Sequence, residues 1–250
     1  MSTTNLRTDL KELKLPVMAE VYKQEAEVAQ ATELGYEEYL LRLAELELTE
    51  KHQKRTERLL RLSRLPLEKS LKEFDIKRLP VRIRAIVNQL LDGSFVTRKE
   101  NVLAFGNPGS GKSHLLCGIG QELINKGFKV LFKKCSLLVQ ELLKAKKELR
   151  LARVIKSLSA FEVLILDDIG YIQQTREEIE VLFTLLSERY ERGTVMVTSN
   201  LVFSEWEKIF KDPMTTAAAI DRLVHHSIIM ELNLPSYRLE SSKKKLKGEN

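Results

Sequence analysis

The sequence predicts an α/β fold, in which a parallel sheet carries helices on both faces and follows a small all-helical domain. Residues 1–66 place apolar residues at helical spacing and contain no strand pattern. After residue 100, short apolar runs alternate with helical patterns, as expected where helices connect parallel strands. The first of these runs leads directly into a glycine-rich loop, which a helical pattern follows. These three observations together predict the fold class.

The composition excludes several other classes of protein. The chain has 250 residues and a mass of 28.8 kDa, and its 43% hydrophobic residues are too many for a disordered or collagen-like chain. No apolar stretch approaches the roughly 18 to 20 residues that cross a bilayer, and the first residues have no signal-peptide core. Two cysteines are too few for a disulfide framework. We therefore expect a soluble, cytoplasmic protein without a membrane partner.

The amino-terminal region is expected to form a helical domain over residues 1–66. Its first 50 residues carry a net charge of −6, whereas the other 200 carry +12. The apolar residues at helical spacing in this region are Leu6, Leu10, Leu13, Tyr36, Leu40 and Leu43. The pattern turns basic after Glu50 and ends at Pro66, because proline interrupts a helix.

Residues 67–240 are expected to form the domain that contains the sheet, followed by a frayed basic tail at residues 241–250. This domain begins with a linker and a helix that starts after Pro80 and ends near Gly93. The apolar runs expected to form strands are residues 102–105, 130–132, 163–166 and 195–197.

The glycine-rich loop fits the pattern G-x-x-x-x-G-K-[ST] at every fixed position, and this is the strongest signal in the chain. Its glycines let backbone N–H groups close on phosphate oxygens, and the following helix adds its unpaired amides. We expect Lys112 to reach the β- and γ-phosphates of ATP and the Ser113 hydroxyl to bind Mg²⁺. The residues expected to hold the nucleotide are Gly106, Asn107, Pro108, Gly109, Ser110, Gly111, Lys112, Ser113 and His114.

Polar residues follow two of the expected strands. Asp167 and Asp168 come directly after a buried strand, where open α/β sheets bind their ligands. We expect Asp167 to bind Mg²⁺ and Asp168 to polarise an attacking water, although an aspartate before Gly170 is also typical of a turn. Asn200 follows the strand at 194–198 and is expected to hold the attacking water; a turn asparagine is the alternative.

Four motifs in this order, GNPGSGKSH, LILDDIGY, VMVTSNLVFSEW and AIDRLVHHS, resemble the AAA+ ATPases of the IstB type, which assist insertion-sequence transposition. Replicative helicase loaders of the DnaC type are close cousins of that family. The resemblance covers nearly the whole chain and implies a P-loop AAA+ core over about residues 67–240. It also implies that the strand before Asn200 lies between the strand that precedes the P-loop and the strand that precedes Asp167.

The same resemblance implies roles for single residues. Lys112 and Ser113 match Walker A, Asp167 and Asp168 match Walker B, and Asn200 matches sensor 1. Most AAA+ proteins have Asp-Glu where this chain has Asp-Asp; the side chain of Asp168 is shorter than that of glutamate, but Asp-Asp is common in this branch of the family. AAA+ sites are completed across a subunit interface by an arginine, and Arg222 matches that position. Its alternatives are the arginines at the end of the preceding helix, which are Arg189 and Arg192, and a plain surface ion pair.

A basic run over residues 126–156 has ten lysines and arginines against two glutamates. Such a run is usually a solvated helix face, but the family binds DNA inside a helical oligomer, and such an assembly would repeat this segment. The residues expected to contact DNA are Lys133, Lys134, Lys144, Lys146, Lys147, Arg150 and Arg153. Residues 51–64 form a second candidate strip. We expect no metal at the adjacent His225 and His226, because neighbouring side chains point apart on a helix or strand.

These features together predict an Mg²⁺-dependent ATPase that forms a homo-oligomer on duplex DNA when ATP binds. Hydrolysis would reset the oligomer, and the transposase of the same insertion sequence would be its partner. The main alternative is a helicase loader of the DnaC type. A small-molecule P-loop kinase and a scaffold that binds ATP without hydrolysis are further alternatives.

Overall fold

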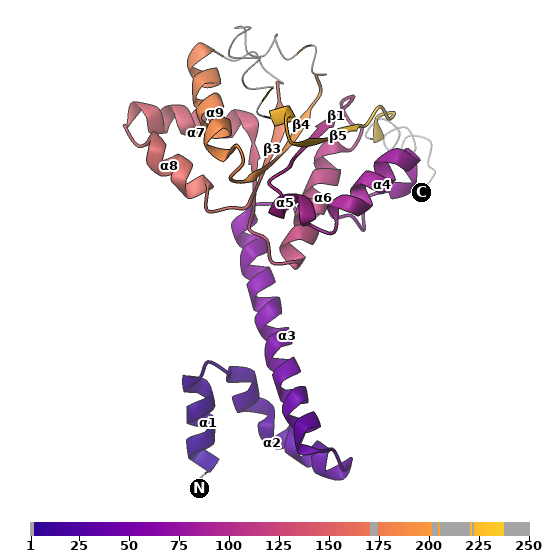
Figure 1. Ribbon diagram of the computed structural model, residues 1–250, viewed down its shortest axis with the longest axis vertical. Helices are drawn as coiled ribbons and strands as arrows, with labels where there is room; N and C mark the ends of the chain where they lie inside the picture. Colours follow the sequence, from indigo (N-terminus) through magenta and orange to yellow (C-terminus); the bar gives the residue numbers. More distant parts are fainter. Residues whose placement is uncertain (1–2, 171–174, 202–204, 206–220, 222, 238–250) are drawn as a thin grey trace, which may run out of the picture. The chain divides into compact units, whose positions relative to one another are not determined.

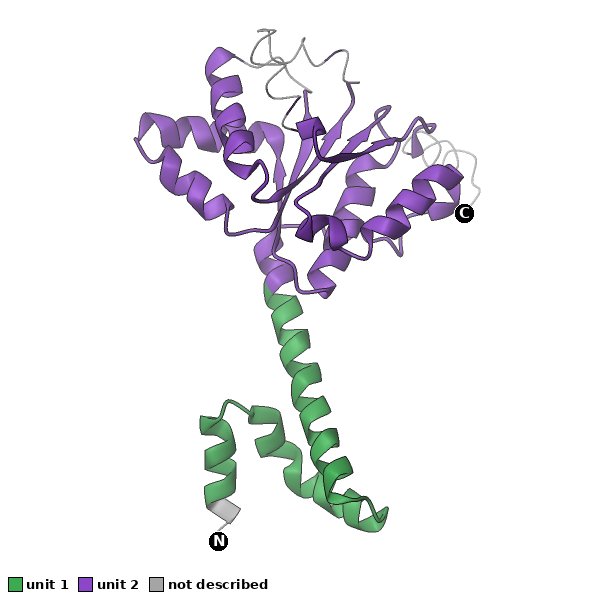
Figure 2. Ribbon diagram, viewed as in Figure 1, with its two compact units in different colours: residues 1–58 green, residues 59–250 purple. Residues whose placement is uncertain are grey.

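The computed structural model describes residues 3–170, 175–201, 205, 221 and 223–237. Its contacts divide the chain into two compact units, residues 1–58 and residues 59–250 (Figure 2). No described helix is long and apolar enough to cross a membrane.

The first unit is helical, as the apolar spacing predicts. It contains α1 (Thr3–Glu12), α2 (Pro16–Ala31) and most of α3 (Tyr36–Ser63) (Figure 1). The carboxylate of Glu47, which is 2% exposed, accepts hydrogen bonds from the backbone N–H groups of Val17 and Met18 at 2.8 and 3.0 Å. A negative charge there also complements the positive end of the α2 dipole, so α3 supplies the amino-terminal cap that α2 lacks.

The second unit contains a five-stranded parallel sheet in the order β2-β3-β4-β1-β5. The strands are β1 (Asn101–Phe105), β2 (Val130–Lys134), β3 (Val163–Ile169), β4 (Thr194–Ser199) and β5 (Ser227–Glu231). The first four contain the predicted strands, but β3 continues to Ile169, so Asp167 and Asp168 lie within its carboxyl end and not after it. The fifth strand, β5, was not predicted. The parallel α/β class is thus confirmed. In addition, β4, the strand before Asn200, lies between β1 and β3, as the resemblance implies.

Helices cover both faces of this sheet, and each face has its own apolar core. On one face α7 (Cys135–Lys147), α8 (Leu151–Leu158) and α9 (Arg176–Arg189) pack against Leu164 and Leu166 of β3. On the other, α4 (Val81–Leu90), α5 (Ser94–Thr97) and α6 (Lys112–Asn125) pack against Val163 and Ile165. Residues alternate between the two faces of a strand, so a strand covered on both sides is continuously apolar.

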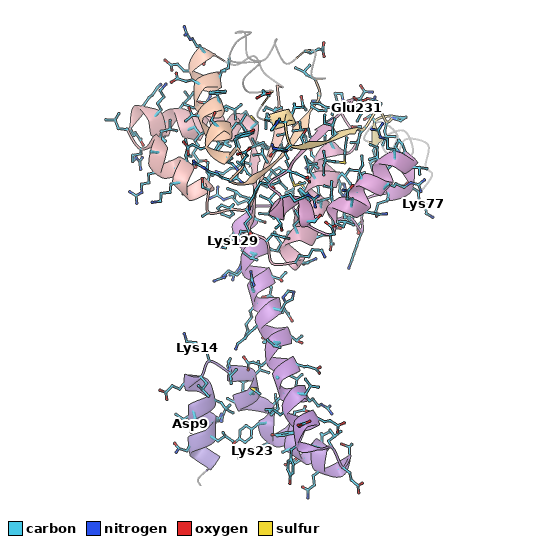
Figure 3. The ribbon with its side chains drawn as sticks, in the orientation of Figure 1. Asp9, Lys14, Lys23, Lys77, Lys129 and Glu231 are labelled. Atoms are coloured by element: carbon cyan, nitrogen blue, oxygen red, sulfur yellow. The ribbon has the colours of Figure 1, made fainter. Side chains whose placement is uncertain are left out.

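Because all five strands are parallel, the sheet has a distinct carboxyl edge and amino edge. Figure 3 labels Lys129, which lies just before β2 begins, and Glu231, which ends β5. The glycine-rich loop, Asp168 and Asn200 lie at or beyond the ends of strands and therefore share the carboxyl edge. The segments just before β4 and β5 share the amino edge.

Candidate nucleotide-binding site

The glycine-rich loop connects the end of β1 to the start of α6, and its three glycines have positive φ angles. These angles are 143° at Gly106, 80° at Gly109 and 95° at Gly111. A Cβ atom at Gly106 would lie 2.2 Å from the backbone oxygen of Leu232, and one at Gly111 would lie 2.8 Å from the Phe74 ring. Both the backbone conformation and the close neighbours therefore require glycine at positions 106 and 111.

Lys112, the first residue of α6, is 4% exposed and lies under this loop. Its ammonium group donates hydrogen bonds to the backbone oxygens of Gly106 at 2.7 Å and Asn107 at 2.9 Å. It also donates to Oδ1 of Asn200 at 2.8 Å. The structure thus brings together two residues that lie 88 positions apart and that the sequence assigned to one phosphate site.

The two aspartates at the end of β3 share one partner on β4. The Thr198 hydroxyl donates to Oδ1 of Asp167 at 2.7 Å and accepts the backbone N–H of Asp168 at 2.8 Å. Asp167 is 4% exposed, whereas Asp168 is exposed, with a φ angle of 60° beside a shift in the β3–β4 register. Asp167 consequently points to the buried side of the site and Asp168 to the open side. The sequence analysis did not single out Thr198.

A pocket of about 510 Å³ is lined by Lys112, Asp167, Asp168 and Asn200. It contains most of the residues predicted to bind nucleotide, together with Asp167, Asp168 and Asn200. Its other lining residues, which the sequence analysis did not assign to the nucleotide site, are Lys69, Glu73, Phe74, Asp75, Arg78, Lys134, Leu234 and Tyr237. Most of them come from the segment before α4 and from the chain just after β5.

Phe74 and Arg78 are held in this lining by specific contacts. The Phe74 ring meets the His114 ring edge-on, with centroids 5.2 Å apart. The Arg78 guanidinium lies 5.1 Å from the centroid of the Tyr237 ring and donates to the backbone oxygen of Pro235 at 3.4 Å. An aromatic surface next to a phosphate-binding loop is suited to the planar base of a nucleotide.

The polar atoms of the pocket fit a phosphate group and a magnesium ion. The Ser110 hydroxyl is buried and has no hydrogen-bond partner among the described residues, although buried polar groups normally have one. A phosphate oxygen in the loop would supply that partner. Asp167 and the Ser113 hydroxyl lie in the same lining and provide the oxygen ligands that Mg²⁺ prefers.

The three arginines considered for completing a neighbouring subunit's site differ in their surroundings. Arg222 lies outside the described residues. Arg189 is 2% exposed and donates to the backbone oxygens of Leu158, Phe161, Glu162 and Thr194. A buried guanidinium cannot reach another subunit, so the structure contradicts this alternative. The Arg192 side chain is 74% exposed and pairs with Glu188 at 3.1 Å.

The basic run extends along β2, α7 and α8, and its residues differ in surroundings. Lys134 ends β2 beside Asp167 and lines the nucleotide pocket, although the sequence analysis assigned it to DNA. Three of the basic residues have carboxylate partners, in the pairs Lys133–Glu141, Lys146–Glu180 and Arg150–Glu148. Among the described residues, no ion pair involves Lys144, Lys147 or Arg153, and all three are exposed.

Comparison with known proteins identifies relatives over almost the whole chain. An insertion sequence ATP-binding protein of Sinorhizobium fredii is 42% identical over 234 residues, 93% of this chain and 78% of the relative. The ATP-binding protein of insertion sequence IS21 from Pseudomonas aeruginosa is 39% identical, covering 94% of this chain and 89% of the relative.

A solved structure of the DnaC helicase loader shares the fold, with a TM-score of 0.53 at 16% identity. The match covers 60% of this chain and 88% of the loader. The family model described as "IstB-like ATP binding protein" matches residues 8–245. The chain therefore belongs to the family of IstB-like ATP-binding proteins.

Proposed function

We propose that this chain is an ATP-dependent, largely sequence-nonspecific DNA-binding regulator of DNA transposition. In this proposal, ATP assembles it into a homo-oligomer on duplex DNA, where it directs or stimulates a partner transposase. Hydrolysis of ATP to ADP and phosphate resets the assembly. The relatives named as insertion sequence ATP-binding proteins support the connection to transposition.

The observation that carries ATP binding is the buried Ser110 hydroxyl of the glycine-rich loop, which has no partner among the described residues, in a loop whose backbone oxygens accept hydrogen bonds from Lys112. Backbone N–H groups of the loop and the amino end of α6 would hold the phosphates, and Lys112 would exchange carbonyl contacts for phosphate oxygens. Phe74 and the Arg78–Tyr237 pair supply surfaces for the base.

In the proposed hydrolysis, each residue at the carboxyl edge of the sheet has a separate role. Ser113 and Asp167 would hold Mg²⁺, which neutralises charge on the phosphates when bound. Asp168 faces the open side of the pocket and would accept a proton from the attacking water, while Asn200 orients that water. Arg222 of an adjacent subunit would neutralise the charge that develops on the transferred phosphoryl group.

The proposed DNA surface is the exposed side of α7 and α8, where Lys144, Lys147 and Arg153 form no ion pair with any residue that the structure describes. Contacts between lysine or arginine and phosphate give little sequence specificity and a strong dependence on salt. Residues 51–64 remain a second candidate for DNA contact.

The test measures phosphate release and duplex DNA binding by the full-length protein, with and without ATP and Mg²⁺. We expect duplex binding to require ATP and larger particles to form on the DNA. Particles and affinity that do not depend on nucleotide would contradict the proposal. Preferential binding of single strands would favour a helicase loader of the DnaC type.

The DNA surface is tested by the double variant Lys144→Ala and Lys147→Ala. If both lysines contact phosphates, the slope of log affinity against log salt should fall by about 1.8, or about 0.9 for each contact. The double variant Lys11→Ala and Lys23→Ala removes the same charge from the first unit and should leave the slope unchanged. Equal slopes for all three proteins would remove α7 from the DNA surface.

The role of Arg222 is tested by mixing two inactive variants. Arg222→Ala should bind ATP without hydrolysing it, and Lys112→Ala should not bind ATP. A mixture restores some activity, because an intact nucleotide site then meets an intact Arg222 from its neighbour. Absence of recovery at every mixing ratio would contradict a role across the interface.

A further inference from the structure

Three side chains that can ligate a metal lie together at the amino edge of the sheet, on the other side from the nucleotide pocket. They are Glu191, three residues before β4, and His225 and His226, which directly precede β5. Because β4 and β5 flank β1, the two segments emerge on either side of one strand (Figure 1). All three side chains are exposed to solvent.

The two histidines do not diverge as the sequence analysis expected. That expectation assumed a helix or a strand, but residues 225 and 226 form a turn between a helical segment and β5. Their ring centroids are 4.2 Å apart, at an interplanar angle of 63°. A turn therefore directs both imidazoles to the same side, where Glu191 also lies.

The distances are close to those of a coordination site. One ligand atom from each residue lies within 4.8 Å of the other two. A tetrahedral Zn²⁺ with bonds of about 2.0–2.1 Å separates its ligand atoms by about 3.3 Å. The remaining contraction is about 1.5 Å at most, and exposed side chains achieve it by rotation about their own bonds.

Neighbouring residues fix the geometry of this cluster. The Tyr190 hydroxyl lies 3.1 Å from Nδ1 of His225, and this hydrogen bond would orient the ring and leave Nε2 for a metal ion. The buried Asn101 holds the two backbone segments in place. Its backbone N–H donates to the oxygen of His226 at 2.7 Å, and its side chain joins Leu223 and Val195.

We propose that Glu191, His225 and His226 form a Zn²⁺ site. Two imidazoles and one carboxylate are ligands typical of zinc, whereas Mg²⁺ prefers an all-oxygen shell and belongs at the nucleotide pocket. Three protein ligands leave a fourth position for water or for a group from another molecule. The bound ion would cross-link Glu191, in the loop between α9 and β4, to the two histidines of the turn before β5.

The experiment titrates Zn²⁺ into tag-free, full-length protein in competition with a chelating dye, with Mg²⁺ in excess so that oxygen sites stay filled. Co²⁺ replaces Zn²⁺ in a parallel titration, because its visible spectrum reports nitrogen ligands and coordination number. We expect one equivalent to bind. We also expect each of His225→Ala, His226→Ala and Glu191→Gln to weaken Zn²⁺ binding by at least about ten-fold, since each removes a side chain that would bind the ion directly.

The matched control is His52→Ala, which removes an exposed histidine from α3 and should keep wild-type Zn²⁺ affinity. Nucleotide binding by each variant reports that the protein is folded, because the pocket lies at the other edge of the sheet. The proposal is overturned if the wild-type protein shows no saturable Zn²⁺ binding. It is also overturned if His225→Ala and His226→Ala are folded and each binds Zn²⁺ as tightly as wild type. Loss of Zn²⁺ binding in His52→Ala would overturn it as well.

Discussion

The ammonium group of Lys112 donates a 2.8 Å hydrogen bond to the side-chain oxygen of Asn200. This contact joins the start of α6 to the end of β4. Together with two backbone oxygens of the loop, it provides hydrogen-bond acceptors for an ammonium group whose residue is 4% exposed. A phosphate group would therefore compete for a cation that already has acceptors, and one of these acceptors, Asn200, is the residue proposed to orient the attacking water.

Replacing Lys112 with alanine should abolish measurable ATP binding. The variant loses the charge that faces the β- and γ-phosphates, and charge-assisted hydrogen bonds to phosphate contribute about 1.5–3 kcal/mol each. Titration with a fluorescent ATP analogue measures the effect. Lys126→Ala changes an exposed lysine just beyond the other end of the same helix and should bind ATP as wild type does. Unchanged affinity in Lys112→Ala would contradict the assignment of the loop.

Thr198→Val should slow ATP hydrolysis by about ten-fold or more, equivalent to roughly 1.4 kcal/mol in the barrier, with little change in ATP affinity. Valine keeps the shape but removes the hydroxyl that bonds to Asp167 and to the backbone of Asp168. Steady-state phosphate release measures the rate. Thr198→Ser keeps the hydroxyl and should restore most of it. Wild-type turnover by the valine variant would show that the two aspartates are positioned without Thr198.

Asp168→Asn should bind ATP and lose hydrolysis by about 100-fold or more, within the range for removal of a general base. Asparagine tolerates the positive φ angle of this position, so the change removes charge without straining the backbone. Stable DNA-bound oligomers should accumulate with ATP, and sedimentation in the presence of duplex DNA measures them. If the variant turns over ATP at the wild-type rate, Asp168 is a turn residue and not the base.

Arg189→Ala should lower the free energy of unfolding by about 3 kcal/mol or more, because four backbone oxygens lose a charged donor. Burial lowers the pKa of Arg189 to about 10, so the side chain is still charged at neutral pH. Urea denaturation followed by circular dichroism measures the change. Arg192→Ala, at an exposed ion pair, should stay within about 0.5 kcal/mol of wild type. A folded Arg189 variant of normal stability would contradict a structural role.

Cys117 should make stability fall as the pH rises above 9. Burial raises the pKa of this thiol from 9.0 to about 12, so the unfolded chain loses the proton first and is favoured by base. The contribution lost is roughly 1.4 kcal/mol for each pH unit above 9. Urea denaturation at pH 8 and pH 10 measures it, with Cys117→Ala as the comparison. The alanine variant should show a smaller decrease, and equal decreases in the two proteins would argue against the buried thiol as the cause.

The parts of the fold that local sequence determines were predicted well. A strand covered on both faces must be apolar throughout, so the runs at residues 102–105, 130–132, 163–166 and 195–197 were recognisable. The glycine-rich loop has a backbone conformation that few residues other than glycine adopt, so its sequence was equally clear. β5 was not predicted. It is an edge strand with a mixed burial pattern, and its pairing with β1 depends on a distant segment.

The parts of the site that depend on long-range packing could not be read from the sequence. Phe74, Arg78 and Tyr237 enter the pocket because chain segments before and after the sheet fold back over the loop. Lys134 belongs to a basic run, but its register with Asp167 places it beside the nucleotide pocket. His225 was judged by the geometry of helices and strands, whereas it lies in a turn.

The middle position of β4 has a thermodynamic consequence. This one strand, with the residue that directly follows it, supplies both Thr198, which contacts the Asp167 carboxylate, and Asn200, which contacts the Lys112 ammonium group. Mg²⁺ and nucleotide would therefore act on the same short piece of backbone. Linkage requires that each ligand change the affinity of the other by the same factor. Shortening or distorting β4 should reduce that factor toward one while leaving each ligand able to bind alone.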